Sequence, residues 1–303
     1  SLASMTLREF VKHCKKWTHM KPSEGTAKRV LEYVGDFLET SEFFHTIQSK
    51  QAVAKQAVTL AMSMDSTSVL IRKQGWKHAT AATVSTYDAQ GNRLDTVYIG
   101  RMPEKGKTQA KRLLEKEVKA ITKKHAFKYT ICIADGARDL WLFFRKKYPN
   151  AIHVVDFFHV CEHLSKLSEL FFKDSSDAKA WFKKHRAILK EDPNGASKVI
   201  RAVRYRRSKT KENPEIEAEL KYLQRNRRRM NYFELKQNNL PIGSGVVEAA
   251  CKNLIGARLK KSGMRWTIDG GQTVLTLRSL ILSNRWEQFW TFFVNCHFPE
   301  FGT

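Results

Sequence analysis

The order of strand-like and helix-like segments between residues 59 and 173 constrains the fold more than any other feature of this chain. Residues 59–71 form a short apolar run that carries Asp65. Residues 78–88 alternate and are rich in β-branched side chains, and they end in the turn DAQGN. A third strand-like run, residues 93–102, follows this turn. Such a turn between two strands predicts an antiparallel hairpin, so the three strands form a meander.

The segments after the meander alternate between helix and strand. A basic helix is expected over residues 105–125, and the continuous apolar run YTICIADGA follows it. We expect a helix over RDLWLFFRKKYP, which Pro149 ends. We then expect a strand over AIHVVDFFHV, which ends at Asp156, and a further helix over HVCEHLSKLSELFF. Continuous apolarity predicts strands buried on both faces. The order β-β-β-α-β-α-β-α therefore predicts an α/β fold, a mixed five-stranded sheet flanked by helices.

The rest of the chain reads as helical, which gives four segments. Residues 1–58 show apolar side chains at three- and four-residue spacing and form a helical N-terminal segment. This segment is either a DNA-binding module or, as we favour, a prefix that packs on the main domain. Residues 59–173 are the first part of the α/β core, and residues 174–240 are a basic helical insertion. Residues 241–303 are the second part of the core.

This second part begins near the segment LPIGSGVVEAACKNLIGARLKKSGMRW. Ser244 is expected to cap a helix that runs to about Lys261, where SGM ends it. The tail GQTVLTLRSLILSNRWEQFWTFF is amphipathic and is expected to be helical. Trp286 and Trp290 lie four residues apart in it, which favours a place in the core.

Three carboxylates stand out. We place Asp65 and Asp135 at or just after the ends of two strands, and strand ends bring side chains together at one edge of a sheet. Two neighbouring carboxylates repel unless they share a cation or a proton, and oxygen ligands suit Mg²⁺. Glu248, on the late helix, is the candidate third acid. Together they predict two metal ions about 3.5–4 Å apart that act on a phosphodiester.

The charge of the chain points to a polyanionic partner. Lys and Arg number 54 against 30 for Asp and Glu, a formal net charge of +24. This excess favours nucleic acid over an anionic membrane surface. No apolar run is long enough for a transmembrane helix. The five cysteines are odd in number and contain no CxxC pair, which speaks against a disulfide framework or a zinc module and for a reducing compartment.

The positive charge is densest in two clusters, Arg201–Lys211 and Arg225–Arg229, interleaved with Tyr205, Tyr222 and Tyr232. Arg and Lys would contact phosphates, and the aromatic rings could stack on unpaired bases. The alternative for the two clusters is a solvated helical face. The alternative for Trp266, which follows the late helix, is a position in the core. The candidate DNA-binding residues are Arg204, Arg206, Arg207, Arg227, Arg228, Arg229, Lys252, Arg258, Lys260, Lys261, Arg265 and Trp266.

Several of these blocks resemble a known family. ADGARDLW and YPNAIHVVDFFHVCEHL resemble the bacterial insertion-sequence transposases related to the Mutator and hAT groups, whose C/D-x-x-H signature corresponds to Asp156 and His159. LPIGSGVVEAACKNLIGARLKKSGMRW, with LRSLILSNRWEQFW downstream, closely resembles the Kra-type insertion-sequence transposases. The resemblance spans roughly residues 60–295. Ser66 stands after the first acid, where the family more often has Gly.

The resemblance implies an RNase H-like fold and a DDE transposase that cuts transposon ends and joins them to target DNA. It implies that Asp65, Asp135 and Glu248 hold two Mg²⁺ ions, for which Mn²⁺ can substitute. Asp156 and His159 would be structural or near the site, although Asp156 could instead be the second acid. The family usually acts as a dimer or larger assembly on DNA, without a membrane, in the bacterial cytoplasm with the nucleoid.

Two rival functions remain open at this point. The first is an RNase H-like, structure-specific nuclease that cuts DNA but does not join strands. The second is a repurposed, non-catalytic DNA-binding protein. All three candidate acids are present, which weakens the second rival.

Overall fold

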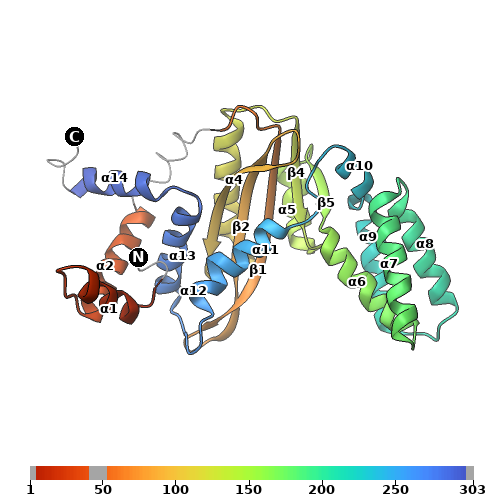
Figure 1. The fold of residues 1–303 in the computed structure, drawn as a ribbon, viewed down its shortest axis with the longest axis horizontal. Helices are drawn as coiled ribbons and strands as arrows, with labels where there is room; N and C mark the ends of the chain where they lie inside the picture. The colour runs from red at the N-terminus through yellow and green to blue at the C-terminus, as the bar shows by residue number, and fades with distance from the viewer. Residues whose placement is uncertain (1–4, 41–52, 298–303) are drawn as a thin grey trace.

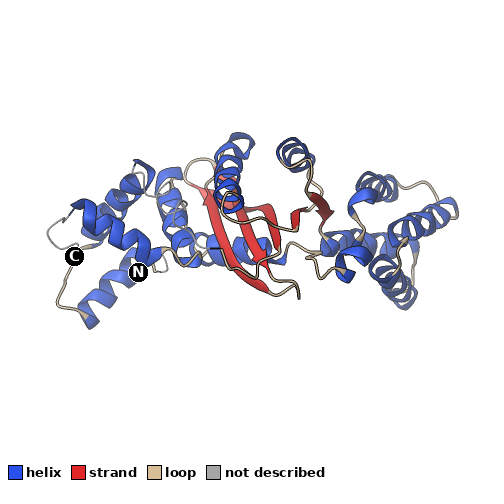
Figure 2. Cartoon of the chain, turned by 90° about the horizontal axis from the view of Figure 1, so that it is seen from above, coloured by secondary structure: helices blue, strands red, loops and turns tan. Residues whose placement is uncertain are grey.

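The computed structural model describes residues 5–40 and 53–297. At the centre of this part lies a five-stranded sheet with helices on both faces (Figures 1 and 2). The strand order is β3-β2-β1-β4-β5, where β1–β2 and β2–β3 are antiparallel and β1–β4 and β4–β5 are parallel. The predicted α/β fold with a mixed five-stranded sheet is therefore confirmed. The strands are β1 (Thr59–Ile71), β2 (Gly75–Tyr87), β3 (Arg93–Arg101), β4 (Tyr129–Ala134) and β5 (Ile152–Val155).

The meander forms as the turn residues predicted. Asp88 opens the β2–β3 turn, where its Oδ1 accepts hydrogen bonds from the backbone N–H groups of Gln90 and Asn92. Gly91 has a φ of +82°, a left-handed conformation that glycine adopts without steric cost. The predicted antiparallel hairpin is confirmed.

Asp65 lies in the middle of β1, so its predicted place at or just after a strand end is wrong. The strand continues to Ile71 because β2 pairs with it along its whole length. However, β4 pairs with β1 only from Thr59 to Ser63. Asp65 is thus two residues beyond the end of the parallel pairing. No residue of β4 pairs with β1 at this position, which lies past the carboxyl end of the β1–β4 ladder.

Helices bury both faces of the sheet. On one face, Leu114 of α4 packs with Met62 and Val84. On the other, Val247 and Leu254 pack with the small alanines of β2. β4 is buried from Ile131 to Ala134, which agrees with its run of apolar residues. The helices over the sheet include α4 (Thr108–Thr122) and α5 (Arg138–Lys147).

The late helix is interrupted rather than continuous to about Lys261. It consists of α11 (Gly245–Ala250), the π-helical segment η3 (Cys251–Gly256) and α12 (Ala257–Leu259). Gly100 of β3 lies against it, and a Cβ there would approach a Leu254 methyl to 3.0 Å. π-helical turns are frequent at functional sites, and this one carries Cys251 beside the candidate acids.

The outer edge of β3 is covered by α13 (Ile268–Leu282). The hydroxyl of Ser283, just after α13, accepts from the Tyr98 N–H at 2.9 Å. Gln272 accepts from the Met102 N–H at 2.9 Å and donates to the Gly100 carbonyl at 3.1 Å. These contacts satisfy edge groups that would otherwise be open to pairing with another chain.

The predicted helical tail is two helices, α13 and α14 (Trp286–His297), separated at Ser283–Arg285. Trp286 packs against the buried Phe289, as expected of a core residue. Trp290 is 49% exposed, so its predicted core position is wrong. It lies on the outer side of α14 and stacks on Trp286.

The N-terminal helices pack on the main body. These helices are α1 (Leu7–Trp17) and α2 (Glu24–Thr40). Leu38 is buried with Leu277 of α13 and Phe289 of α14. The favoured prediction of a packed prefix is therefore confirmed for the described part of this segment; residues 41–52 lie outside the described residues.

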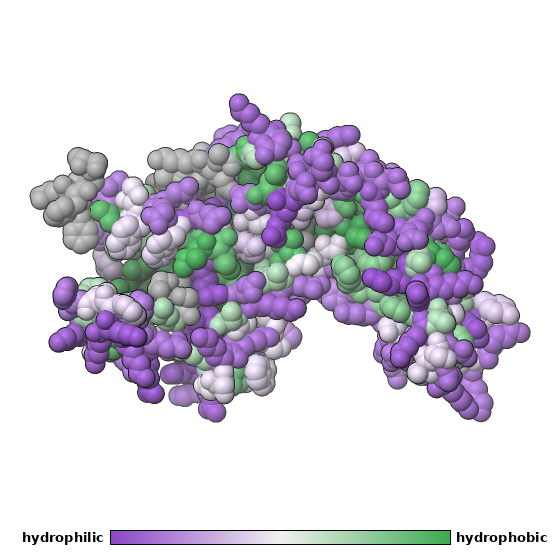
Figure 3. Space-filling model, in the orientation of Figure 1, coloured by the Kyte–Doolittle hydropathy of each residue, from purple (hydrophilic) through white to green (hydrophobic). Residues whose placement is uncertain are grey.

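Between β5 and α11 the chain is helical, in keeping with the predicted insertion. Figure 1 shows α7, α8 and α9 beside one another at one end of the molecule, joined to the sheet by α6. Mostly hydrophilic side chains cover α7 and α8 (Figure 3). No helix in the described ranges is long and apolar enough to cross a bilayer. All five cysteines are free. The helices are α6 (Phe157–Phe171), α7 (Ser175–Glu191), α8 (Gly195–Ser208), α9 (Pro214–Asn226), η2 (Arg227–Arg229) and α10 (Tyr232–Gln237).

A buried ion pair joins α4 to the α13–α14 junction and gives a first prediction. The two guanidinium Nη atoms of Arg285 donate to the two carboxylate oxygens of Glu117 at 2.8 Å each, and both side chains are buried. Glu117→Gln should lower the free energy of unfolding by about 3–5 kcal/mol, because it leaves a buried guanidinium without its counter-charge. Urea denaturation measures this. The exposed-pair variant Glu32→Gln, whose partner is Lys28, is the control and should cause no measurable change.

Candidate active site

Asp156 ties two distant segments of the chain together. It follows β5 directly and is 0% exposed. Its Oδ1 accepts from the backbone N–H groups of Phe158 at 2.5 Å and His159 at 3.2 Å. Its Oδ2 accepts from the backbone N–H and the hydroxyl of Ser244. Two donors on each oxygen fill the roughly four lone-pair sites of a carboxylate, so Asp156 fixes the start of α6 to the loop before α11.

Ser244 therefore does not act as predicted. It stands at the N-cap position of α11, but its side chain caps no N–H of that helix. Its hydroxyl donates instead to Asp156. The backbone reinforces the junction, because the Phe157 N–H donates to the Ile242 carbonyl at 3.0 Å.

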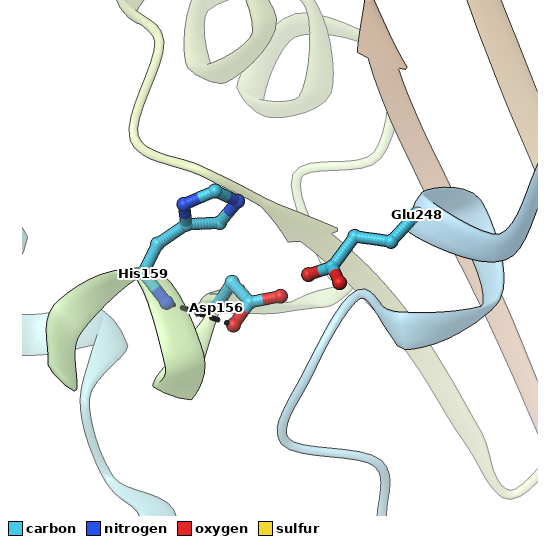
Figure 4. A group of neighbouring side chains, drawn as sticks. All are labelled: Asp156, His159 and Glu248. Atoms are coloured by element: carbon cyan, nitrogen blue, oxygen red, sulfur yellow. Dashed lines mark hydrogen bonds between the residues drawn. The ribbon is translucent and has the colours of Figure 1, made fainter. Parts of the chain in front are cut away.

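Glu248 extends from α11 toward Asp156 and His159 (Figure 4). One ligand atom from each of these three residues lies within 4.8 Å of the others. Glu248 is half-buried and, in the part of the chain that the structure describes, its carboxylate accepts no hydrogen bond. A carboxylate so placed, beside the buried Asp156, needs a nearby positive charge.

His159 supplies part of that charge in the metal-free protein. Burial opposes its protonation, but Asp156, Glu162 and Asp135 outweigh burial and raise the pKa of the imidazole above its ordinary value. Its Nδ1 lies 3.1 Å from Glu162 Oε2. A protonated His159 and a bound cation would therefore compete for the same negative charge.

Asp135 follows β4, and a tyrosine of the helical insertion donates a hydrogen bond to it. Its Oδ1 accepts from the Ala137 N–H at 2.9 Å, and its backbone carbonyl accepts from the Tyr222 hydroxyl at 2.7 Å. Gly136 has a φ of +109°, and a Cβ there would come within 2.6 Å of the Tyr222 ring. Glycine is thus required where α9 meets the loop after β4. In the described residues, no donor to Asp135 Oδ2 is present.

Asp65 contacts the π-helical segment. Its Oδ2 accepts from the Cys251 thiol at 3.6 Å, and its Oδ1 accepts from the Ser66 N–H at 2.6 Å. Burial, then Asp65 and more weakly Glu248, raise the pKa of Cys251 to about 12. The thiol stays neutral and lies in the electrostatic field of two candidate acids.

The structure groups Glu248 with Asp156 and His159, while Asp65 and Asp135 border this group. The assignment of Asp65, Asp135 and Glu248 as the metal-binding triad stays a prediction. Proximity to Glu248 favours the alternative, in which Asp156 is the second acid. Four hydrogen bonds on Asp156 oppose it, because a cation would have to displace buried donors. Asp135 has one oxygen without a donor in the described residues, but it is not part of the group whose ligand atoms lie within 4.8 Å of one another.

The donor set suits a hard cation. Carboxylate oxygens of Glu248, Asp135 and Asp65 are available or singly bonded, and Mg²⁺ commonly binds through one or two carboxylates while it keeps several waters. Cys251 adds a single thiol to this set, and that thiol donates to Asp65. The site accordingly offers oxygen ligands, with one imidazole beside them.

Of the six predicted DNA-binding residues near α11, four are exposed and two are part of the packing. Lys260 reaches the hydroxyl of Thr67, two residues beyond Asp65 on β1. Arg258 is only 3% exposed and lies over the Trp266 ring at 4.8 Å. The Trp266 indole donates to the Leu259 carbonyl at 3.1 Å. Arg258 and Trp266, predicted to bind DNA, are therefore occupied in packing. The exposed residues are Lys252, Lys260, Lys261 and Arg265.

The tyrosines of the insertion differ from the prediction as well. Tyr205 is 64% exposed, but Tyr222 and Tyr232 are buried. The Tyr222 ring stacks on His163 at 3.6 Å, and the Tyr232 hydroxyl donates to the Val155 carbonyl. Only Tyr205 of these three is free to stack on a base.

Of the predicted arginines, three belong to the surface of α8. Arg206 lies over the Phe172 ring, Arg207 pairs with Glu217, and Arg204 faces the Gln224 amide. Arg227–Arg229 form η2.

Sequence reasoning missed the roles of Ser244, Cys251 and Tyr222. Ser244 and Asp156 are 88 residues apart, and Tyr222 and Asp135 are 87 apart. No local pattern signals such contacts, because each depends on how the helical insertion folds back on the sheet.

Two substitutions separate the structural role of Asp156 from a ligand role. Asp156→Asn should lower the free energy of unfolding by about 2–3 kcal/mol, because its amide cannot accept from all four donors. Glu248→Gln should leave stability unchanged or raise it, because it removes carboxylate repulsion, and should abolish Mn²⁺ binding. Urea denaturation and calorimetric titration with Mn²⁺ measure the two effects. An Asp156→Asn protein that is stable but binds no Mn²⁺ would contradict this division.

Cation binding should depend on the protonation of His159. As the pH rises through the raised pKa of His159, the Mn²⁺ affinity should rise, by up to about tenfold per pH unit below that pKa, because the cation displaces a proton from the same field. Titration calorimetry in buffers of different ionisation enthalpy measures the released proton. In His159→Gln the pH dependence should flatten. An identical pH dependence in that variant would show that another group titrates.

The chain matches no protein-family model and no curated protein. What is said of its activity therefore depends on the residues and the geometry described above.

Proposed function

We propose that this protein is a DDE transposase, a metal-dependent enzyme that cuts DNA at transposon ends and transfers the cut strand into target DNA. The observation that carries the proposal is Glu248. It is a half-buried carboxylate without a hydrogen-bond donor among the described residues, and it extends from α11 toward the edge where β4 and β5 end. A cation bound beside this acid would balance its charge and that of the neighbouring Asp156.

The arrangement of the sheet supports an RNase H-like fold. Three antiparallel strands are followed by two parallel strands in the order β3-β2-β1-β4-β5. The central strand, β1, carries Asp65, its parallel neighbour β4 leads into Asp135, and a helix from the far side of the insertion supplies Glu248. This is the order of acids that the resemblance to Kra-type transposases implies.

In the proposed mechanism Asp65, Asp135 and Glu248 hold Mg²⁺. When bound, Mg²⁺ would lower the pKa of water and stabilise the leaving oxygen of the phosphodiester. The chain itself positions the reactants. Asp156 orients α11, the Tyr222 hydroxyl holds the Asp135 loop, and the Cys251 thiol holds one oxygen of Asp65.

DNA would lie over the same edge. Lys260 places its ammonium group beside Thr67, near Asp65 on β1, where it could neutralise a phosphate next to the cut. Further positive charge comes from exposed residues that follow Glu248 in the sequence, namely Lys252, Lys261 and Arg265. The net charge of +24 supports a polyanionic partner of this kind. A dimer or larger assembly would bring two DNA ends together, in the cytoplasm with the nucleoid.

A strand-joining assay tests the proposal. The purified protein is mixed with Mg²⁺ or Mn²⁺, a supercoiled target, and a labelled duplex that carries the terminal sequences flanking the coding gene. Asp65→Asn, Asp135→Asn and Glu248→Gln should each lower cleavage and joining by at least about a thousandfold and leave DNA binding largely intact. Glu191→Gln, the same chemical change at an exposed position on α7, should retain full activity.

The outcomes separate the three functions. Joined product that requires all three acids supports the transposase. Cleavage without joining would identify a structure-specific nuclease. Salt-sensitive binding without any chemistry would identify a non-catalytic DNA-binding protein. Normal cleavage in one of the acid variants would remove that residue from the site.

A further inference from the structure

A large cavity lies between the outer edge of β5 and the helical insertion. Its volume is about 1100 Å³, and seven arginines line it. Arg145 comes from α5, Arg201 and Arg204 from α8, and Arg225 and Arg227–Arg229 from the end of α9 and from η2. A cavity of this size holds a ligand at least as large as a typical small organic molecule rather than a single ion.

The positive charge in this cavity is not compensated by the protein. In residues 5–40 and 53–297, none of the seven arginines forms an ion pair with a carboxylate. The single acid in the lining, Glu234, accepts a hydrogen bond from the Asn231 side chain. Like charges gathered around one space repel, which costs free energy unless an anion enters. Burial, and then the neighbouring Arg145, lower the pKa of Arg229.

Neutral groups hold several of these guanidinium groups in place. Arg229 packs on the Trp141 ring at 4.4 Å and donates to the Asn226 side chain at 3.0 Å. The Arg145 Nε donates to the Trp141 carbonyl at 3.3 Å. With its amide oxygen toward Arg204, Gln224 accepts from two nitrogens at 3.2 Å each. These partners orient the arginines without cancelling their charge, which leaves donors for phosphate oxygens.

The cavity is separate from the candidate active site but connected to it. Within the described chain, none of the candidate active-site residues lines it; these are Asp65, Asp135, Asp156, His159 and Glu248. Arg225 lies three residues, about 4.5 Å along the helix axis, after Tyr222, whose hydroxyl holds the Asp135 carbonyl. The lining also contains Tyr129 and Ile152, at the starts of β4 and β5, so the cavity extends along the β5 edge away from the acids that follow the strand ends.

We propose that this cavity binds consecutive phosphates of one nucleic-acid strand at a position distinct from the acidic residues. The inference rests on the proposed function only in the choice of nucleic acid as the source of the phosphates. Guanidinium groups that match phosphate oxygens would supply salt-dependent affinity, as in other grooves that follow a single strand.

The test compares two triple variants of equal charge in the full-length protein. Arg201→Gln, Arg227→Gln and Arg228→Gln alter the cavity at side chains that make no hydrogen bond or ion pair in the described part of the chain. Lys179→Gln, Lys183→Gln and Lys184→Gln remove the same charge from exposed positions on α7, outside the cavity. Fluorescence anisotropy with a labelled 15-nucleotide oligothymidylate, in EDTA and at several salt concentrations, measures binding. Circular dichroism checks that each variant is folded.

The cavity variant should bind at least about tenfold more weakly, and its slope of log affinity against log salt should fall by about 2, at roughly 0.7 for each lost contact. The α7 variant should keep the slope of the unaltered protein. Equal losses in the two variants would overturn the inference, because binding would then be a diffuse effect of net charge. Inorganic tripolyphosphate that binds the cavity when the oligonucleotide does not would overturn the choice of a strand.

The same measurement on Glu248→Gln separates this inference from the proposed function. Its oligonucleotide binding should equal that of the unaltered protein, because the cavity needs neither metal nor Glu248. Binding of this kind in a protein without strand joining would support the cavity while contradicting the transposase. Oligonucleotide binding that is lost in Glu248→Gln would place the strand at the acids and overturn the inference.

Discussion

The buried carboxylate of Asp156 is the interaction on which the site depends. Removing a carboxylate from water costs free energy unless both of its oxygens accept hydrogen bonds. Here four donors from two segments of the chain supply these hydrogen bonds. One pair of donors begins α6, and the other belongs to Ser244, just before α11. The whole helical insertion lies between these segments in sequence. The carboxylate therefore brings Glu248 back to the strand ends after the chain has left the sheet for more than sixty residues.

Charge balance around Glu248 then decides what the site can hold. Glu248 and Asp156 bring two negative charges together, and Asp135 adds to the field that His159 experiences. A proton on His159 or a cation among the carboxylates satisfies this field, and the two exclude each other. The neighbouring Cys251 stays a neutral thiol and acts only as a donor to Asp65. The side chains around Glu248 therefore present carboxylate oxygens, one imidazole and one neutral thiol.

The positive charge of the chain is distributed in two places with different surroundings. Around α12 the lysines are exposed and lie beside β1, close to the acids. In the cavity next to β5 the arginines are oriented by Trp141, Asn226 and Gln224. α9 joins the cavity to the acids, because Tyr222 near its end holds the Asp135 loop and the arginines that follow line the cavity. A substrate that touches both would be positioned relative to the acids by the rigid helix between them.

The sequence by itself determined the strands, their alternation with helices, the β2–β3 turn and the helical nature of the insertion. These features follow from local patterns: periodic apolar side chains, turn residues, and continuous apolar runs at strands buried on both faces. It also singled out Asp65, Asp135, Glu248, Asp156 and His159. Only the tertiary structure decided where these residues lie relative to one another. It placed Asp65 inside β1, because β2 pairs beyond the end of β4. It also buried Arg258 and Tyr222, and it joined Ser244 to Asp156. Contacts between residues almost ninety positions apart leave no local pattern, since they exist only after the insertion has folded back onto the sheet.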